Sequence, residues 1–572
     1  MAACSFGEMP KKQMICRVVL AASVSVVLMV FVWYRTGICF ETNDDVTIAS
    51  ILSGVITGEP EPHVVYVNYL LSLPLSLLYR MTVHVPWYGG MLVLLMTLCL
   101  GAMLDSAFTR CSRGLHYVPV TAGVAGFTAA YYYCMEMMQY TSVAAFLAVG
   151  GYVCFLLRRS RRTALVWFFV LELLAFLLRS EAMLMIQPLG LAAAAASMPE
   201  KQQRPPWWKE ALTAAALLAL VLCTGGMGSL AGYHGKDWDR YKQFNDTRSL
   251  LFDYYHALDY EEIRPLLEEY GVSREKYEAY REYVILDWKM DGAMEEQMKD
   301  YMEEHQGKFP QMGKLLQDVL RASGVDIPWR IRYVTLLAWG VYCLWMLLNG
   351  RWVRCILGGA FILGARTAVW AYLVWRGRLP LRVTLPLLAA EVIFLLALVW
   401  RDYEGREAAG WRRFLLLIGC GGWGLSCLIA AREQIRYGEW AGGSQQTMME
   451  GLREIREYCD SRPGNRYILD AGSMVYFTGS VFETGVYRPV NAVYSGGWFS
   501  TTPGAQKRLE EYLGTAPGFY FLILDDGGQE NSGGFRYLVQ EMGQEPTLAD
   551  QWTASHGGSY YVYYFEGAFP FS

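Results

Sequence analysis

Two adjacent carboxylates follow the first long apolar run of the chain. Asp44 and Asp45 close the segment Phe40-Glu-Thr-Asn-Asp-Asp, shortly after the apolar residues 18–34. A carboxylate within hydrogen-bond reach of a hydroxyl group can accept its proton as the hydroxyl attacks an electrophilic carbon. Charge beside membrane hydrocarbon is costly, which favours a functional role. A second interpretation stays open, because Asp is preferred at helix starts and a helix is expected from Val46.

Three arginines crowd a short connection between two later apolar runs. Arg376, Arg378 and Arg382 lie between the runs 355–375 and 383–400. The planar fork of a guanidinium group donates two parallel hydrogen bonds to a phosphate, so this spacing predicts a phosphate-binding site. The alternative is that the arginines anchor a helical hairpin at the lipid headgroups.

Other polar residues near the ends of apolar runs are weaker candidates. Arg179 and Glu181 form either a substrate-binding pair or an interfacial ion pair worth little energy. His63 is a candidate substrate-binding residue, and with His234 and Asp45 it has donor atoms suitable for a divalent metal ion. Lone histidines are also common in ordinary loops, so no metal ligand is assigned and a divalent ion stays an open cofactor.

The composition sets the class of protein that must position these residues. The chain has 572 residues, of which 53% are hydrophobic and 18% charged, with a net charge of −4. Soluble domains carry about 25% charged residues. The shortage of charge excludes an ordinary soluble enzyme, and the absence of a basic field argues against a nucleic-acid partner. A multi-pass membrane protein is expected.

Eleven apolar runs are long enough to be considered as membrane-spanning helices. The segment 64–79 is interrupted by Asn68 and Pro74, and we expect it to lie as a helix on the outer membrane surface. The eleven runs are 18–34, 87–104, 117–134, 141–157, 164–178, 182–196, 211–230, 334–348, 355–375, 383–400 and 414–431.

The basic residues orient these spans. Clusters at 110–113, 158–162, 201–209, 351–354 and 401–413 all fall on one side, which the positive-inside rule assigns to the cytoplasm. The N-terminus is then cytoplasmic and the C-terminus extracytoplasmic, in the plasma membrane. The arginines of 376–382 break this bias, because they lie on the outer side.

The polar regions divide the chain into four expected parts. Residues 1–231 form a transmembrane module whose first outer loop is 41–86, 232–328 form a helical extracytoplasmic insert, 329–433 return to the membrane, and 434–572 form an outer α/β domain. In that domain helices are expected at 448–459 and 505–512, and strands at 466–470, 518–524 and 560–565, which suggests a partly parallel sheet.

The chain resembles the GT-C superfamily of integral membrane glycosyltransferases in its span pattern and in the loop motif Asn43-Asp44-Asp45. The resemblance implies a donor that is a sugar linked to polyprenyl phosphate and a glycan, lipid or protein acceptor on the outer face. It also implies that an acidic residue of this loop is the catalytic base or a metal ligand. Transfer by one carboxylate with cationic partners is inverting, because it needs no covalent intermediate. The general acid–base pair of glycoside hydrolases is discounted, since neighbouring residues cannot flank a sugar from opposite sides.

Two other classes of protein remain as alternatives. A flippase or transporter of lipid-linked glycans would show charged residues along a path through the bilayer and internal symmetry, and neither is evident. A non-catalytic cell-envelope assembly protein would tolerate the loss of both Asp44 and Asp45.

Two charges within neighbouring apolar runs are expected to pair. Arg366 and Glu391 lie at similar depths on either side of the connection 376–382. An unpaired arginine near the bilayer centre costs at least a few kcal/mol, so a partner on the adjacent helix is expected. The alternative is that Arg366 faces a catalytic cavity.

Overall fold

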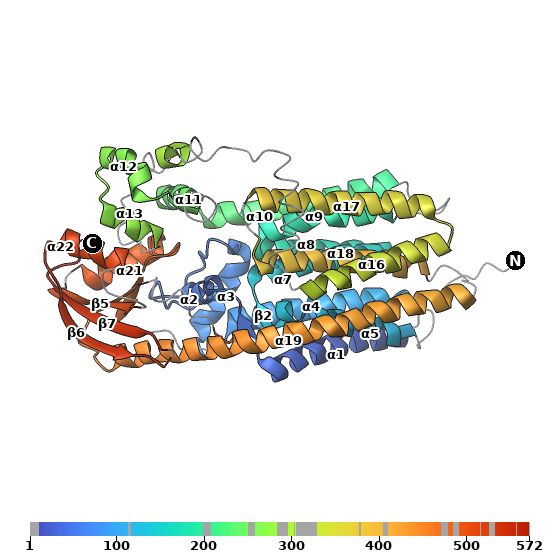
Figure 1. Ribbon diagram of the computed structural model, residues 1–572, viewed down its shortest axis with the longest axis horizontal. Helices are drawn as coiled ribbons and strands as arrows, with labels where there is room; N and C mark the ends of the chain where they lie inside the picture. The colour runs from blue at the N-terminus through green and yellow to red at the C-terminus, as the bar shows by residue number, and fades with distance from the viewer. Residues whose placement is uncertain are drawn as a thin grey trace.

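A computed structural model describes most of the chain. The described residues are 11–111, 116–197, 207–249, 258–282, 296–301, 304, 329–376, 379–403, 410–470, 479–483, 491–514, 516–525, 532–555 and 557–570. The molecule is elongated, with a bundle of long helices at one end and a small sheet at the other (Figure 1). The helices run roughly along the long axis, and the N- and C-termini lie at opposite ends.

The bundle is built from the apolar runs. Each of the eleven expected runs overlaps a helix, because its side chains can be buried against other helices or exposed to lipid. These helices are α1 (Lys11–Thr36), α4 (Trp87–Phe108), α5 (Tyr117–Ala130), α7 (Tyr140–Leu157), α8 (Arg161–Leu178), α9 (Ser180–Ala196), α10 (Trp207–Gly232), α16 (Trp329–Leu348), α17 (Trp352–Trp375), α18 (Leu381–Tyr403) and α19 (Gly410–Asp460).

Eight helices of the described residues are long and apolar enough to cross a membrane: α1, α4, α7, α10, α16, α17, α18 and α19. The other three expected spans are α5, α8 and α9, of which α5 and α9 are short, with 14 and 17 residues. The expected span 117–134 is divided, since α5 ends at Ala130 and the one-turn helix α6 (Tyr132–Glu136) follows. The chain is therefore a polytopic helical membrane protein, and the number of spans is not fixed at eleven.

The expected pair of intramembrane charges is confirmed. Arg366 Nε on α17 lies 3.2 Å from Glu391 Oε2 on α18. Glu391 is fully buried, and its other oxygen accepts a hydrogen bond of 2.6 Å from the indole of Trp339 on α16. One carboxylate thus connects three helices. Arg366 and Glu391 lie at similar depths, as expected, and their two helices also turn these side chains toward each other.

A second buried carboxylate joins helices near the C-terminal end of α4. Asp105 on α4 pairs with Arg17 of α1 at 2.7 Å and with Arg158, at the end of α7, at 2.8 Å. Each oxygen of Asp105 has its own guanidinium partner, which satisfies a charge that would otherwise be expensive to bury.

The first loop lies between the bundle and the sheet (Figure 1). It contains α2 (Asn43–Leu52) and α3 (Tyr69–Met81), where the side chain of Asn68 accepts from the N–H of Leu70 and so caps α3. The structure corrects two expected boundaries. α2 begins at Asn43 and not at Val46, and the segment expected as a helix from residue 64 becomes helical only at Tyr69. A short parallel pair of strands, β1 (Cys39–Phe40) and β2 (Met137–Met138), fixes the entry to this loop.

The described part of the insert is helical, as expected. It comprises α11 (Lys236–Arg248), α12 (Tyr260–Glu269) and α13 (Arg274–Arg281), and α13 lies beside α22 (Gly533–Met542) of the C-terminal domain. Ser273 donates to the side chain of Gln540 at 2.8 Å, and the backbone N–H of Gly533 donates to Glu282 at 2.6 Å. The insert is thereby fastened to the C-terminal domain.

The C-terminal domain is an α/β sandwich around a mixed five-stranded sheet. The strand order is β4-β3-β5-β7-β6, with β3 parallel to β4 and β5, and β7 antiparallel to β5 and β6. The strands are β3 (Tyr467–Asp470), β4 (Ala492–Ser495), β5 (Gly518–Asp525), β6 (Thr547–Thr553) and β7 (Ser559–Glu566).

Helices cover both faces of this sheet. The end of α19 packs on one face through Leu452 and Ile455, while α21 (Pro503–Leu513) and α22 pack on the other through residues such as Leu513 and Leu538. The expected partly parallel sheet is confirmed. The expected helix 448–459 is the last part of α19, a helix of 51 residues that runs without a break across residue 434. β4, β6 and α22 were not expected.

Candidate active site

Asp45 is the most enclosed of the candidate residues. It lies in the first turn of α2 and has no exposed surface. Its Oδ1 accepts hydrogen bonds from the hydroxyl of Tyr88 at 2.9 Å and from the backbone N–H of Tyr140 at 3.2 Å, and Thr42 donates to Oδ2 at 3.3 Å. Asp45 therefore holds α2 against the starts of α4 and α7.

The surroundings of Asp45 favour its neutral form. Burial raises its pKa well above the usual range, and the nearby carboxylates of Asp44 and Glu41 raise it further. The hydrogen bonds from Tyr88 and Tyr140 act in the opposite direction without cancelling this effect. A buried, neutral carboxyl group is poorly suited to accept a proton from a substrate, so its arrangement is that of a positioning residue.

Asp44 differs from its neighbour in exposure and in partners. It is half-buried, and its Oδ1 accepts a hydrogen bond of 3.1 Å from the indole Nε1 of Trp498. Trp498 belongs to the C-terminal domain, 454 residues away in the chain, and the hydroxyl of Tyr241 in the insert donates to its carbonyl at 2.9 Å. Three separate parts of the sequence thus meet at Asp44.

Arg179 lies in the same aromatic group. Its guanidinium carbon is 4.8 Å from the ring centre of Tyr66 and 5.5 Å from that of Tyr140. Tyr66 in turn contacts the ring of Trp498 edge-on, with 4.8 Å between the ring centres. Burial alone would lower the pKa of Arg179, but Tyr140, Glu181, Tyr66 and Asp44 together raise it, so the group keeps its positive charge.

The partner of Arg179 within its own segment is exposed. Arg179 Nε lies 3.0 Å from Glu181 Oε2, and the side chain of Glu181 is 68% exposed. The structure thus brings Arg179 to the acidic pair, and leaves Glu181 at the outside of the cluster. An ion pair with one exposed partner contributes little to stability.

Glu41 is an acidic residue of the same loop that the sequence did not single out. Burial raises the pKa of Glu41 to about 7, although Arg382 and the hydroxyl of Tyr133 lower it. Glu41 also accepts a hydrogen bond from the backbone N–H of Arg382 and raises the pKa of Asp45. Its position within the motif that contains the aspartates was the one signal available in the sequence.

The three arginines of the later connection are placed differently. Arg382 lies in the first turn of α18, next to Glu41, and its carbonyl accepts a hydrogen bond of 3.1 Å from Ser142. Arg376 is half-buried at the end of α17. Arg378 lies outside the described residues. Of the three, Arg382 is therefore the one that the structure connects to the acidic loop.

His63 is held in a separate aromatic group. Its Nδ1 contacts Glu61, its Nε2 lies 2.9 Å from the carbonyl of Gly232, and its ring packs against Tyr69 and Trp238. Both ring nitrogens are engaged, which leaves neither free for a metal ion. Within the described parts of the chain, no group of three or more His, Cys, Asp and Glu side chains is arranged to hold a metal.

The chain matches no protein-family model, no curated protein and no solved structure. The chemistry of the site must therefore be judged from its own geometry. That geometry combines an accessible carboxylate, a buried carboxyl that positions two helices, a charged arginine on aromatic rings, and an indole from a distant domain.

Proposed function

We propose that this protein is a GT-C-type glycosyltransferase that moves a sugar from a polyprenyl-phosphate donor to an acceptor on the extracytoplasmic side of the membrane. The observation that carries the proposal is the position of Asp44 and Arg179 on one aromatic cluster, formed by Tyr66, Tyr140 and Trp498. Aromatic rings offer flat apolar surfaces for sugar rings, while the two charged groups have the signs that the reaction needs. The acceptor is a glycan, a lipid or a protein.

Asp44 is the proposed base because a base must reach the acceptor. The acceptor hydroxyl oxygen attacks the anomeric carbon, its proton passes to Asp44, and the bond between that carbon and the phosphate oxygen breaks. The polyprenyl phosphate leaves with the electron pair of this bond, and its growing negative charge needs a cation. A single displacement inverts the anomeric configuration.

Arg179 is the proposed partner of the leaving phosphate. Its guanidinium is charged, and its planar fork suits phosphate oxygens. Arg382, next to Glu41, is a second cation at the acidic loop, and Arg376 and Arg378 remain candidates for the same role. Asp45 serves in this proposal as the residue that fixes α2 through Tyr88 and Tyr140.

The test is transfer by the purified full-length chain in lipid nanodiscs, offered a panel of polyprenyl-phosphate sugars and measured by release of polyprenyl phosphate. Asp44→Asn should lower the rate by about 10²–10⁴-fold, the usual contribution of a general base. The exposed Asp237→Asn, on α11, is the matched control and should keep full activity. Full activity in Asp44→Asn would exclude Asp44 as the base.

A second pair of variants tests the phosphate site. Arg179→Lys should impair the reaction nearly as much as Arg179→Ala, because a lysine keeps the charge but loses the fork and the contact with Tyr66 and Tyr140. Glu181→Gln should have little effect, since its side chain is mostly exposed. If Arg179→Ala left the affinity for polyprenyl phosphate unchanged, Arg179 would be a structural residue.

The proposed orientation can be examined separately. Cysteines substituted at Thr42 and Gly377 in a cysteine-free background should both react with an impermeant maleimide added from outside the cell. Labelling of the Gly377 position only from the cytoplasm would remove the arginines of this connection from the proposed site.

A further inference from the structure

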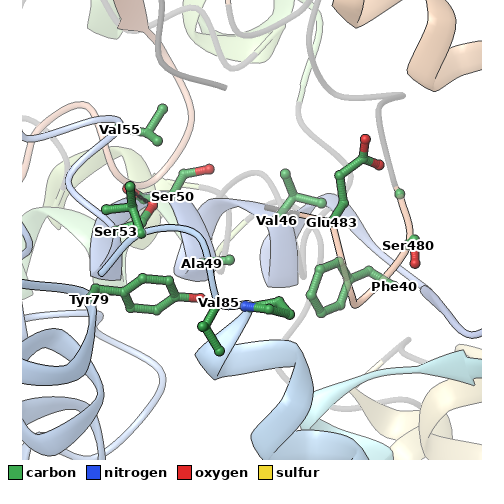
Figure 2. Close-up of a pocket in the computed structure, with 13 residues that line it drawn as sticks. Phe40, Val46, Ala49, Ser50, Ser53, Val55, Tyr79, Val85, Ser480 and Glu483 are labelled. Carbon is green, nitrogen blue, oxygen red and sulfur yellow. Dashed lines mark hydrogen bonds between the residues drawn. The ribbon is translucent and has the colours of Figure 1, made fainter. Parts of the chain in front are cut away.

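A pocket with an empty volume of 680 Å³, part of it open to solvent, lies beside α2. Figure 2 shows the side chains that line it, which come from three segments. α2 contributes Val46 and Ala49, the connection between α3 and α4 contributes Val83 and Val85, and the stretch 479–483 of the C-terminal region forms the third wall.

The pocket is distinct from the carboxylate cluster. Its α2 residues are 46, 49, 50 and 53, which share one face of a helix with 3.6 residues per turn. Asp44 projects about 160° from Val46 around the helix, so it points away from the pocket. Asp45 projects to one side of the face that lines the pocket, and it accepts a hydrogen bond from Tyr88. A ligand in the pocket would therefore occupy a different place from the proposed sugar donor.

The walls of the pocket are mostly apolar, and two of their polar side chains are already engaged. Valine, alanine and proline side chains and the rings of Phe40 and Tyr79 form most of the surface. The carboxylate of Glu483 pairs with Arg453 at 2.8 Å, and the hydroxyl of Ser53 donates to the carbonyl of Ser50 at 3.3 Å. Few hydrogen-bonding groups remain for a sugar or a peptide, whose binding sites need several.

The stretch 479–483, which forms the third wall, is held by backbone hydrogen bonds to β1 and to the residue before it. The N–H of Phe40 donates to the carbonyl of Gly479 at 2.9 Å, and the N–H of Val481 donates to the carbonyl of Ile38 at 3.0 Å. In the same stretch, Phe482 is 37% exposed, and its ring centre lies 5.8 Å from that of Trp33, near the end of the apolar helix α1. Exposed aromatic rings at helix ends are typical of a membrane surface.

One lining residue near the start of α4 is itself exposed. Val85 lies two residues before the apolar helix α4, and it is 38% exposed. Leu77 and Met81 are 50% and 80% exposed and lie on the face of α3 opposite Tyr79, which lines the pocket. An amphipathic helix with such a face lies in the interface between lipid and water. The pocket thus lies beside Val85 and Phe482, which are exposed apolar residues, and behind a helix, α3, whose outer face is suited to the membrane surface.

We propose that this pocket holds a single hydrocarbon chain of a membrane lipid, which enters between α3 and the start of α4. The inference does not depend on the glycosyltransferase reaction. The apolar walls favour a hydrocarbon over water, few polar groups remain for a polar ligand, and the membrane surface suited to the outer face of α3 would supply the occupant.

The test uses the full chain in phosphatidylcholine nanodiscs that contain phosphatidylcholine with a photoreactive diazirine at the end of one acyl chain. After illumination and proteolysis, cross-linked peptides are identified by mass spectrometry. The peptides that contain Ala49 and Val85 should be labelled. Ala49→Phe, which fills the pocket, should lower their labelling by about tenfold, the factor expected when roughly two methylene groups lose apolar contact.

Two further variants make the result decisive. Ala216→Phe makes the same substitution at an exposed position of α10 and should leave the labelling of the pocket peptides unchanged. Val85→Asp puts a charge at the exposed opening and should reduce labelling without disturbing the core, so it decides the question if Ala49→Phe does not fold. Unlabelled pocket peptides, or equal labelling in the wild type and Val85→Asp, would overturn the proposal, as would equal labelling by a water-soluble diazirine.

Discussion

The ion pair between Arg366 and Glu391 offers a measurable test of how the bundle is held together. Glu391 has 1% of its side chain exposed, whereas Arg366 has 27%. Removing either partner therefore has unequal consequences. Arg366→Met leaves a fully buried carboxylate with Trp339 as its remaining hydrogen-bond donor. Glu391→Gln leaves a guanidinium that is partly exposed and retains an amide oxygen for Trp339.

These differences set the expected magnitudes. Breaking a buried ion pair by deleting one partner costs about 3–5 kcal/mol, and Arg366→Met should fall in this range. Glu391→Gln should cost about 1–2 kcal/mol, the size of a perturbed hydrogen bond. The double variant, Arg366→Met with Glu391→Gln, removes both charges and keeps the hydrogen bond from Trp339. It should lose only about 2 kcal/mol, so that the coupling between the two sites is about 3 kcal/mol.

The measurement is a double-mutant cycle of the unfolding free energy in mixed micelles, with size-exclusion chromatography to confirm that each variant folds. A coupling energy below about 0.5 kcal/mol would mean that the two residues act independently and would refute the pairing. If Arg366→Met kept full stability but lost all activity, Arg366 would instead act in a substrate cavity.

Three other predictions follow from buried or distant contacts. Burial raises the pKa of Glu41 in the folded state to about 7, above its value in the unfolded chain. Its contribution to stability therefore falls by about 3 kcal/mol as the pH rises from about 4.5 to 7. Glu41→Gln should flatten a plot of Tm against pH across this interval. Gly438→Ala on α19 should lower stability by about 1–3 kcal/mol in thermal unfolding, because its Cβ would overlap the carboxylate of Glu136; an unchanged Tm would mean that α19 has room to shift. Trp498→Phe removes the donor to Asp44 and should lower transfer while leaving secondary structure by circular dichroism unaltered; wild-type transfer would exclude a role for this indole.

The helices of the bundle were predictable because each apolar run is a local signal. Residues that must lie in lipid or in a helix–helix contact are apolar over a whole segment, and this can be read without knowing the neighbours. The pairing of Arg366 with Glu391 was predictable for a related reason. Both depths can be counted from one short connection, and the cost of an unpaired charge then demands a partner.

The site was predictable only in part, since its contacts span the chain. Asp44 and Asp45 are visible in the sequence as an adjacent pair, but their different burial depends on Tyr88, Tyr140 and Trp498. Nothing near residue 44 indicates an indole 454 positions away. Arg179 was a weak candidate because its segment shows only a pair of opposite charges, while its aromatic surroundings form on folding.

The missed elements of the C-terminal domain have a local explanation. β6 is an edge strand with the sequence TLADQWT and mostly exposed side chains, and it carries an irregularity between Leu548 and Asp550. A strand whose side chains are mostly exposed on both faces needs no alternation of apolar and polar residues, so it lacks the pattern by which strands are recognised. β4 has only four residues, which is too short to show a period.

The continuous helix α19 connects the membrane bundle to the sheet, so that a tilt of the helix in the bundle also moves the sheet. Its 51 residues extend over about 76 Å at 1.5 Å per residue. A tilt of about 5° at the membrane end would therefore move the sheet end by about 6–7 Å. The helix also fixes the rotational phase of the domain, because one inserted residue would turn everything beyond it by about 100°. Such an insertion would carry Trp498 away from Asp44, whereas an insertion of eleven residues, close to three whole turns, would restore the phase but lift the indole by about 16 Å. The hydrogen bond between Trp498 and Asp44 therefore constrains both the length of α19 and the rotation about its axis, although neither residue belongs to α19.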